Sequence, residues 1–390
     1  MPYFMQLGDV PRKRFSQHRK PDGSLYATEV MGEEGFSADF SLLFHQHSPS
    51  DLLRCEPVAC SPTQWLPNHP LQPRLFNPQA LPAGDAFSGR HVLLGNADVS
   101  VAWVHADQPS GLHRNAIGDE LWFVHEGEAT LETVFGALAV AAGDYVVIPK
   151  AVTHAWLPQP GKALRALVFE TSGHVRSPAR YLSNTGQYLQ VAPYSEPDLR
   201  RPAAPLLRDG LEVPVLVKTR HGLTRHVMAR HPFDVAGWFG CNYPFALNIA
   251  DFSPVSGSFH RPPPVHQVFE APGLVLCNFV PRMLDYDPRA VPLPSFHSNV
   301  DSDELIFYAE GNFFSRKGAG IARGALSLHP AGHIHGPHPG AVEGSLARIG
   351  QRTEEVAVML DTFQPLQMAA SAVALEDARY VHSWHGDSHA

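Results

Sequence analysis

Residues 297–311 read HSNVDSDELIFYAEG, and residues 113–127 read HRNAIGDELWFVHEG. When the first histidines are aligned, the stretches share an asparagine, an Asp-Glu-Leu triplet, a phenylalanine and a closing Glu-Gly. A second pair of blocks follows them, GDYVVIPKAVTH at 143–154 and GALSLHPAGHIH at 324–335, with glycine, proline and histidine at equal spacings. Two blocks that recur in the same order indicate a duplicated architecture.

The repeated stretches have the composition of β-strands, because they are rich in β-branched and aromatic residues and end at glycine. The 36 prolines and 31 glycines supply many turns. We therefore expect an all-β fold built from two small barrels or jelly rolls, an N-terminal domain with its linker over 1–230 and a C-terminal domain over 231–390. The apolar spacing over 362–384 predicts one short helix near the C-terminus.

Composition argues against several classes of protein. The net charge is −8 and no dense stripe of Lys and Arg is present, which argues against a nucleic-acid partner. We find neither the apolar core of a signal peptide nor a stretch long enough to cross a bilayer, so we expect no membrane association. The four cysteines form no CxxC pair, which favours free thiols in the reducing cytoplasm.

Three residues of the second copy have the character of metal ligands. His297 and Glu304 lie seven positions apart around the start of the predicted strand, and His335 ends the second block. Two imidazoles and one carboxylate form a facial set that suits Fe(II) or Mn(II) and leaves coordination positions open for a substrate and dioxygen. His329 and His333 lie nearby, and one of them is a candidate for orienting a ligand through a hydrogen bond.

The chain resembles the homogentisate 1,2-dioxygenase family, whose members are built from two cupin barrels (bicupins). The resemblance rests on the HSN and DE residues of the opening stretch and on four further segments. These are DGSLYATEVMGEEGFSADFSLLFHQHSP (22–49), FDVAGWFGCNYPFALNIADF (233–252), SLHPAGHIHGPHPG (327–340), and VMLDTFQPLQMAASAV (358–373) with the later Ser-Trp. The similarity covers most of the chain and is stronger in the second half.

The resemblance implies Fe(2+) held by His297, Glu304 and His335. It also implies a histidine that acts as acid and base, which by position is His260 in SFHRPPPVH, with His266 as its competitor. A neutral imidazole is suited to take a phenolic proton from a hydroquinone and to return it later. The implied reaction joins O2 to the aromatic ring of homogentisate and yields maleylacetoacetate. The partners implied are this small aromatic acid, O2 and further copies of the chain in a homo-oligomer.

Two features leave the substrate open. The family often has Gly-His-Tyr shortly after the glutamate, whereas this chain has Gly-Asn-Phe at 311–313. The substrate carboxylate needs a cationic or polar partner, and Arg261, Arg316 and Lys317 are equal candidates. Gentisate or a hydroxynaphthoate is an alternative substrate, and a metal-binding bicupin without oxygenase activity is an alternative class.

The first copy keeps all three ligand types in His113, Glu120 and His154. Three interpretations are open: a vestigial barrel whose polar residues hydrogen-bond each other, a second structural metal site, or the active site itself. Arg114 and Lys150 add positive charge next to these residues, which disfavours a cation. The first half has no counterpart of the implied acid–base histidine, so we place catalysis in the second copy.

Overall fold

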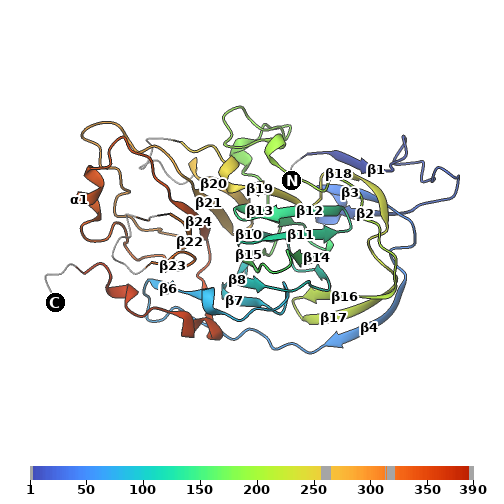
Figure 1. Cartoon of the computed structure of the whole chain (residues 1–390), viewed down its shortest axis with the longest axis horizontal. Coiled ribbons are helices and arrows are strands. Elements are labelled where there is room, and N and C mark those ends of the chain that lie inside the picture. The colour runs from blue at the N-terminus through green and yellow to red at the C-terminus, as the bar shows by residue number, and fades with distance from the viewer. Residues whose placement is uncertain (1–2, 256–264, 312, 314–320, 386–390) are drawn as a thin grey trace. The chain divides into compact units, whose positions relative to one another are not determined.

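The computed structural model describes residues 3–255, 265–311, 313 and 321–385, and these residues form an almost entirely β structure (Figure 1). One α-helix is present among them, α1 (Ala341–Leu346), together with short 3₁₀ helices. The predicted all-β class is confirmed, and each copy of the repeated blocks lies in its own compact unit.

The two compact units interleave along the chain. The first contains residues 1–62, 82–90 and 104–248, and the second contains residues 63–81, 91–103 and 249–390. Two strands, β7 (Arg90–Gly95) and β8 (Val99–Ala106), contribute residues to both units. The division into domains 1–230 and 231–390 therefore stays a prediction, and the units are described below one at a time.

The first unit is built from sheets whose strands pair antiparallel, except that β9 and β16 pair parallel. One sheet has the order β1-β18-β3-β2, another has the order β12-β11-β14-β9-β16-β17-β4, and β19-β13-β10-β15 form a further set of neighbours. The strands are β1 (Met5–Gly8), β2 (Ala27–Gly32), β3 (Phe40–His45), β4 (Leu52–Val58), β9 (Leu112–Asn115), β10 (Glu120–Glu126), β11 (Glu128–Thr133), β12 (Gly136–Ala141), β13 (Asp144–Ile148), β14 (Thr153–Pro158), β15 (Leu164–Thr171), β16 (Leu211–Thr219), β17 (Gly222–Arg230), β18 (Val235–Gly240) and β19 (Phe245–Asn248). Its 3₁₀ helices are η1 (Glu34–Phe36), η3 (Ala179–Tyr181) and η4 (Glu196–Asp198).

The second unit is centred on one antiparallel sheet of order β20-β21-β24-β22-β23-β6, beside a smaller set β7-β25-β5. Its strands are β5 (Trp65–Leu66), β6 (Arg74–Phe76), β20 (Gln267–Ala271), β21 (Leu274–Phe279), β22 (Asp303–Glu310), β23 (Leu326–His329), β24 (Val356–Thr362) and β25 (Gln367–Ala369). Its 3₁₀ helices are η2 (Pro78–Ala80), η5 (Ile249–Asp251), η8 (Ala370–Leu375) and η9 (Tyr380–His382).

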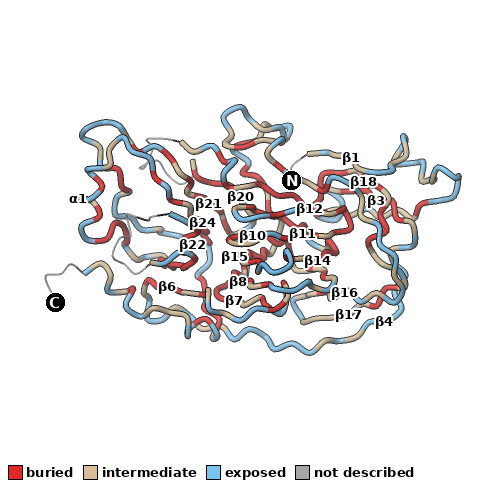
Figure 2. The backbone as a smooth tube through the Cα atoms, viewed as in Figure 1, coloured by how far each residue is buried: buried red, intermediate tan, exposed pale blue. Residues whose placement is uncertain are grey.

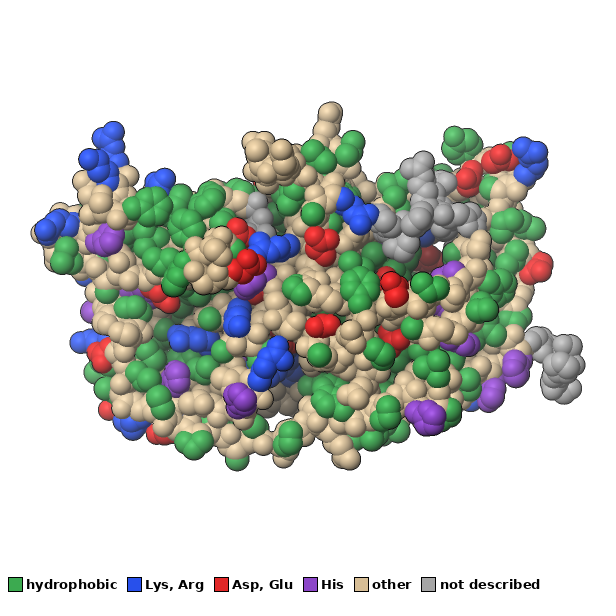
Figure 3. Space-filling view, turned by 180° about the vertical axis from the view of Figure 1, so that it is seen from behind, with side chains coloured by type: hydrophobic (Ala, Val, Ile, Leu, Met, Phe, Trp, Pro, Cys, Tyr) green, Lys and Arg blue, Asp and Glu red, His purple; other side chains and the backbone are tan. Residues whose placement is uncertain are grey.

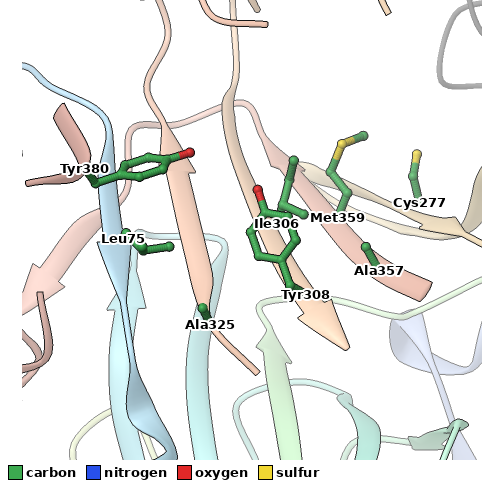
Figure 4. Packing of buried hydrophobic residues seen from close by; sticks show 8 residues of the cluster. All are labelled: Leu75, Cys277, Ile306, Tyr308, Ala325, Ala357, Met359 and Tyr380. Carbon is green, nitrogen blue, oxygen red and sulfur yellow. The ribbon is translucent and has the colours of Figure 1, made fainter. Parts of the chain in front are cut away.

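Strands β10, β15, β22 and β24 are buried along most of their length, as their red segments in Figure 2 show, whereas β4 and β17 are mostly exposed or partly buried. In the second unit, one cluster of buried side chains holds β22 between its neighbours and the end of the chain. Removing an Ile or Met side chain of this cluster from water stabilises the fold by about 2 kcal/mol. Figure 4 shows its members, Leu75, Cys277, Ile306, Tyr308, Ala325, Ala357, Met359 and Tyr380.

An aspartate at the start of the repeated strand anchors two loops in each copy. In the first unit, Asp119 accepts hydrogen bonds from the backbone N–H groups of Lys150 and Val175, both at 2.8 Å. In the second unit, Asp303 accepts them from Ala331 and Leu366 at 2.9 and 2.8 Å. Lys150 and Ala331 occupy equivalent positions in the aligned blocks, so the duplication extends to side-chain contacts.

The helix predicted over 362–384 differs from the structure in its extent. This segment contains the short strand β25, then the 3₁₀ helices η8 and η9 separated by extended residues. Pro365 lies near its start and disfavours helical backbone for the residue before it, Gln364. Met368 and Ala369 pair with Leu66 and Trp65 of β5, and this tertiary pairing takes precedence over the local apolar spacing.

No helix among the described residues is long and apolar enough to span a membrane. On the face drawn in Figure 3, basic and acidic side chains are interspersed, as the small negative net charge predicts.

A charged histidine ties three segments of the first unit together. His45, at the end of β3, lies 2.6 Å from Asp234 through Nδ1 and 3.0 Å from Glu29 of β2 through Nε2. Burial lowers the pKa of His45, but the hydrogen bonds to the two carboxylates outweigh this effect and raise the pKa to about 9. The folded protein therefore binds this proton more tightly than the unfolded chain does.

We predict that His45→Gln lowers the free energy of unfolding by about 2 kcal/mol at pH 7, allowing for solvent screening of the partly exposed Glu29. The wild-type advantage is complete below pH 6.5 and is lost as the pH rises through about 9, because the raised pKa belongs to the folded state. Thermal unfolding of both proteins from pH 6 to 10 measures this. His47→Gln, an exposed neighbour, is the matched control, and a difference that grows with pH would contradict the assignment.

Candidate metal centre

Glu304 lies at the start of β22, on the same inward face of the strand as Ile306 and Tyr308 of the buried cluster. The antiparallel pairing sets its neighbours. His329, the last residue of β23, is its partner on one side, and Asp361 of β24 is its partner on the other. Glu304 is almost completely buried, so its negative charge needs a compensating partner.

The two histidines of the predicted triad lie opposite each other on paired backbone. The N–H of His297 donates to the carbonyl of His335 at 2.8 Å, and the N–H of His335 donates to the carbonyl of His297 at 2.9 Å. Their ring centroids are 4.4 Å apart. Nε2 of His335 lies 3.3 Å from Oε1 of Glu304, and Nε2 of His297 lies 3.9 Å from Oε2. The structure thus brings the three predicted residues together.

One ligand atom from each residue lies within 4.8 Å of the other two. Within the described part of the chain, no other group of His, Cys, Asp or Glu meets this distance. The histidine side chains differ in exposure, since His335 is fully buried whereas His297 is 40% exposed. A cation would therefore have protein on the side of His335 and an opening on the side of His297.

Hydrogen bonds fix which ring nitrogens face the centre. Nδ1 of His297 lies 2.8 Å from the carbonyl of Ser295, and Nδ1 of His335 lies 3.2 Å from the carbonyl of His333. A carbonyl only accepts, so each Nδ1 carries the proton and each Nε2 presents a lone pair. Nε2 of His335 is buried without a hydrogen-bond partner. Two imidazole lone pairs beside a carboxylate fit a divalent cation.

Two further side chains orient Glu304. Nδ1 of His329 lies 2.8 Å from Oε1 of Glu304, and Nε2 of His329 lies 2.9 Å from the hydroxyl of Tyr380 in η9. The imidazole donates to the carboxylate and accepts from the phenol, so the chain Tyr380–His329–Glu304 is satisfied at each step. His329 therefore has the supporting position proposed from sequence. Tyr380 was missed, because its spacing suggested only packing.

Electrostatics keep Glu304 ionised. Burial alone would raise the pKa of Glu304, but the hydrogen bond from His329 and the adjacent imidazoles of His297 and His335 hold it well below its usual range. On the opposite strand, burial and then the charge of Glu304 raise the pKa of Asp361 to about 7. The centre therefore holds one carboxylate that stays charged at neutral pH.

The structure separates His266 from this centre. The N–H of Asn278 donates to the carbonyl of His266, and Asn278 lies at the level of Phe307 in the strand register. Phe307 is three residues from Glu304, which is about 10 Å along the strand. Burial, and then the charge of Arg282, lower the pKa of His266 to about 4, so it is a weak base.

Other predicted site residues lie outside the described residues. These are His260, Arg261, Arg316 and Lys317. The acid–base role of His260 stays a prediction, as do the three candidates for binding the substrate carboxylate. Phe313, where the family pattern has tyrosine, contacts Tyr308 with ring centroids 4.8 Å apart and packs against the core cluster.

The first copy repeats the backbone pairing of this centre, but several of the surrounding side chains differ. His113 pairs with His154 on adjacent strands, and Glu120 lies between Ile148 and Glu170, at the positions that match His329 and Asp361. The imidazoles are neutral, since burial lowers the pKa of His113 to about 3 and also lowers that of His154. Both nitrogens of His113 are buried without hydrogen-bond partners, and its ring stacks on Phe87 at 4.0 Å.

Arg90 supplies the compensating charge in the first copy. Its guanidinium lies 3.0 Å from Oε1 of Glu120 and 3.5 Å from Oε2 of Glu170, in a buried position. Asn115 donates to both carboxylates at 2.8 and 2.7 Å, and Lys218 lies 2.7 Å from Glu170. Burial would raise the pKa of Glu120, but Arg90 holds it well below its usual range. This network favours the interpretation of the first copy as a vestigial barrel. The positive charge that faces Glu120 is that of Arg90, and not that of Arg114 or Lys150 as the sequence suggested.

We predict that Arg90→Met lowers the free energy of unfolding by about 3 kcal/mol, because two buried carboxylates lose their partner. It also leaves Glu120 and the imidazoles of His113 and His154 open to a cation. We expect one additional equivalent of Zn²⁺ per chain, measured by equilibrium dialysis, and a larger rise in unfolding temperature on adding Zn²⁺ than in the wild type. The control is Arg225→Met, which removes an exposed ion pair with Glu56. Equal zinc content in all three proteins would refute the role of Arg90.

Comparison with known proteins supports an oxygenase relationship. Residues 95–249 match the family model described as homogentisate 1,2-dioxygenase N-terminal. A protein of Saccharolobus solfataricus that is named provisionally as a dioxygenase is 34% identical over 388 residues, which cover 99% of this chain and 100% of that protein. Homogentisate 1,2-dioxygenase of Bradyrhizobium diazoefficiens is 28% identical over 297 residues, which cover 70% of this chain and 62% of that protein.

The match therefore spans less than two thirds of the length of that homogentisate 1,2-dioxygenase. Among solved structures, a cupin 2 conserved barrel domain protein from Leptotrichia buccalis covers 69% of this chain and 86% of its own, with 10% identity and a TM-score of 0.31, too low to compare the folds in detail. The end-to-end match to the first relative and the family-model match confirm the resemblance: the chain belongs to the homogentisate 1,2-dioxygenase family.

Proposed function

We propose that this protein is an Fe(II)-dependent ring-cleaving dioxygenase that converts homogentisate and O2 to maleylacetoacetate. The observation that carries the proposal is the convergence of His297, Glu304 and His335, with two Nε2 lone pairs and one ionised carboxylate. Family membership supports the oxygenase class. When bound, Fe(II) would supply the redox chemistry that lets dioxygen react with an aromatic ring.

The residues of the chain would bind and orient. Glu304 stays charged because three imidazoles hydrogen-bond to it or lie beside it, so it neutralises part of the charge of a divalent cation. Tyr380 and His329 fix the plane of the Glu304 carboxylate. The exposed side of His297 is the direction from which a substrate would enter. A nearby base would take the phenolic proton, and His260 is our candidate.

We also propose a cytoplasmic protein that forms a homo-oligomer. The four cysteines are free thiols, which agrees with a reducing compartment.

The first test is oxygen uptake by protein that was purified anaerobically and loaded with Fe(II), with homogentisate and gentisate offered separately. We expect uptake with homogentisate alone, with one ring-cleaved product molecule per O2. In His297→Ala, which loses one of three ligands, we expect turnover to fall at least about 100-fold and iron retention to fall with it. The control is His221→Ala, an exposed histidine of the first unit.

Three outcomes would count against parts of the proposal. Wild-type iron content and turnover in His297→Ala would show that the centre is elsewhere. Uptake with gentisate instead of homogentisate would leave the dioxygenase class standing and replace the substrate. Bound iron without uptake on either compound would favour a metal-binding bicupin of another activity.

The Tyr380–His329–Glu304 chain gives a separate prediction. Tyr380→Phe removes only the hydroxyl that donates to His329, while the ring keeps its place in the core cluster. Because supporting hydrogen bonds typically change metal affinity by about 10-fold or more, we expect weaker Fe(II) binding in a competition titration with a chelator. Tyr308→Phe, whose hydroxyl contacts Ser327, is the matched control. Unchanged Fe(II) affinity in Tyr380→Phe would mean that the hydrogen bond from Tyr380 to His329 does not support the metal centre.

A further inference from the structure

The two faces of strand β9 in the first unit have different roles. His113 and Asn115 are buried on the inner face, next to Glu120. Arg114 lies on the other face, between Leu112 and Ala116, which pack against the apolar cluster of Val215, Val217 and Met228. The aliphatic stem of Arg114 is therefore directed past apolar side chains, and only its guanidinium meets polar groups.

The guanidinium of Arg114 lacks a matching anion. Its Nε donates to the hydroxyl of Thr153 at 2.8 Å, which fixes the plane of the group. Within the described part of the chain, no carboxylate lies in ion-pair distance of Arg114, although other partly buried arginines, such as Arg176, have one. Burial lowers the pKa of Arg114, which means that its charge is incompletely solvated. The two terminal nitrogens are thus available to a ligand.

A cleft opens beside this guanidinium. It holds about 550 Å³ of empty space, including space open to solvent, and lies between β2, β17 and the turn that precedes β14. Its apolar lining includes Met31, Val134 and Met228, and Thr153 and Arg114 form part of its polar lining. The charged side chains of Asp51 and Arg230 and the imidazole of His231 also line the cleft, so its surface combines apolar and charged groups. The guanidinium of Arg114 lies beside the apolar side chains, which is an arrangement suited to a small organic anion.

Two of the acidic residues that line the cleft, Asp234 and Glu29, are engaged by His45. Asp234 binds Nδ1 of His45 with one oxygen and accepts from the N–H of His47 with the other. Glu29 lies 3.0 Å from Nε2 of the same imidazole. The protonated His45 thereby offsets part of the negative charge of this pair, while Arg114 remains without a direct partner.

We propose that this cleft binds a small organic acid, with its carboxylate on the guanidinium of Arg114 and its apolar part against Met31, Val134 and Met228. The planar fork of arginine matches a carboxylate through two parallel hydrogen bonds, and Thr153 holds it in position. None of these residues belongs to the metal centre, so this is a second binding site in the chain. It is independent of the proposed reaction.

The test is ¹⁹F NMR titration of full-length, metal-free protein with 4-fluorophenylacetate, a carboxylate with an apolar ring. We expect saturable broadening with the wild type and at least about a tenfold weaker affinity in Arg114→Gln, because a charged hydrogen-bond pair is lost. Arg225→Gln, an exposed arginine of β17, is the control and should bind as the wild type does. Met31→Trp fills the cleft from its apolar side while leaving Arg114 intact, and it should also abolish binding.

Each other outcome overturns the proposal. Unchanged affinity in a folded Arg114→Gln would place the probe elsewhere, including at the metal centre. If Arg114→Gln does not fold, as judged by its thermal unfolding, Met31→Trp replaces it in the test. Retained binding in Met31→Trp would likewise show that the probe binds elsewhere. Absence of saturable binding to the wild type would exclude a carboxylate site. Binding of inorganic phosphate that depends on Arg114, without binding of the fluorinated acid, would exclude the ligand class.

Discussion

A buried glutamate that faces a second carboxylate across paired strands is the constraint on which both units depend. Glu304 lies opposite Asp361, and Glu120 lies opposite Glu170. Two negative charges inside a sheet are costly unless a cation or donors compensate them. Each unit satisfies this requirement differently, and the difference separates a candidate metal centre from a closed network of ion pairs.

In the first unit, Arg90 compensates the two negative charges by contacting both carboxylates, and the amide of Asn115 donates a hydrogen bond to each of them. In the second unit Asn299 keeps the matching contact with Asp361 at 2.9 Å, and the imidazoles of His297 and His335 face Glu304. A buried arginine therefore distinguishes the first copy from the candidate metal centre of the second, although both copies keep the same ligand types.

The hydrogen bonds that fix the loops around these sites are shared by both copies, whereas the side chains within the sites differ. Asp119 and Asp303 each accept two backbone N–H groups from equivalent loops, so the strand start is fixed in the same way. The support for Glu304 is specific to the second unit, because Tyr380 comes from the 3₁₀ segment near the end of the chain. The candidate metal centre thus combines a repeated scaffold with a supporting contact found in the second copy.

Local composition and spacing were enough to predict the duplication, the β class and the three candidate ligands, because these features lie within short blocks of sequence. Which charged groups meet depends instead on how distant segments pack. Arg90 precedes His113 by 23 residues and lies outside the repeated blocks, and Tyr380 follows His329 by 51, so no local pattern links them to the glutamates. In the sequence, His266 was the alternative to His260 as the acid–base residue. The strand register separates it from Glu304. The segment 362–384 forms a strand and 3₁₀ helices instead of one helix because it pairs with β5. This strand lies about 300 positions earlier in the chain, and the pairing outweighs the local helical preference.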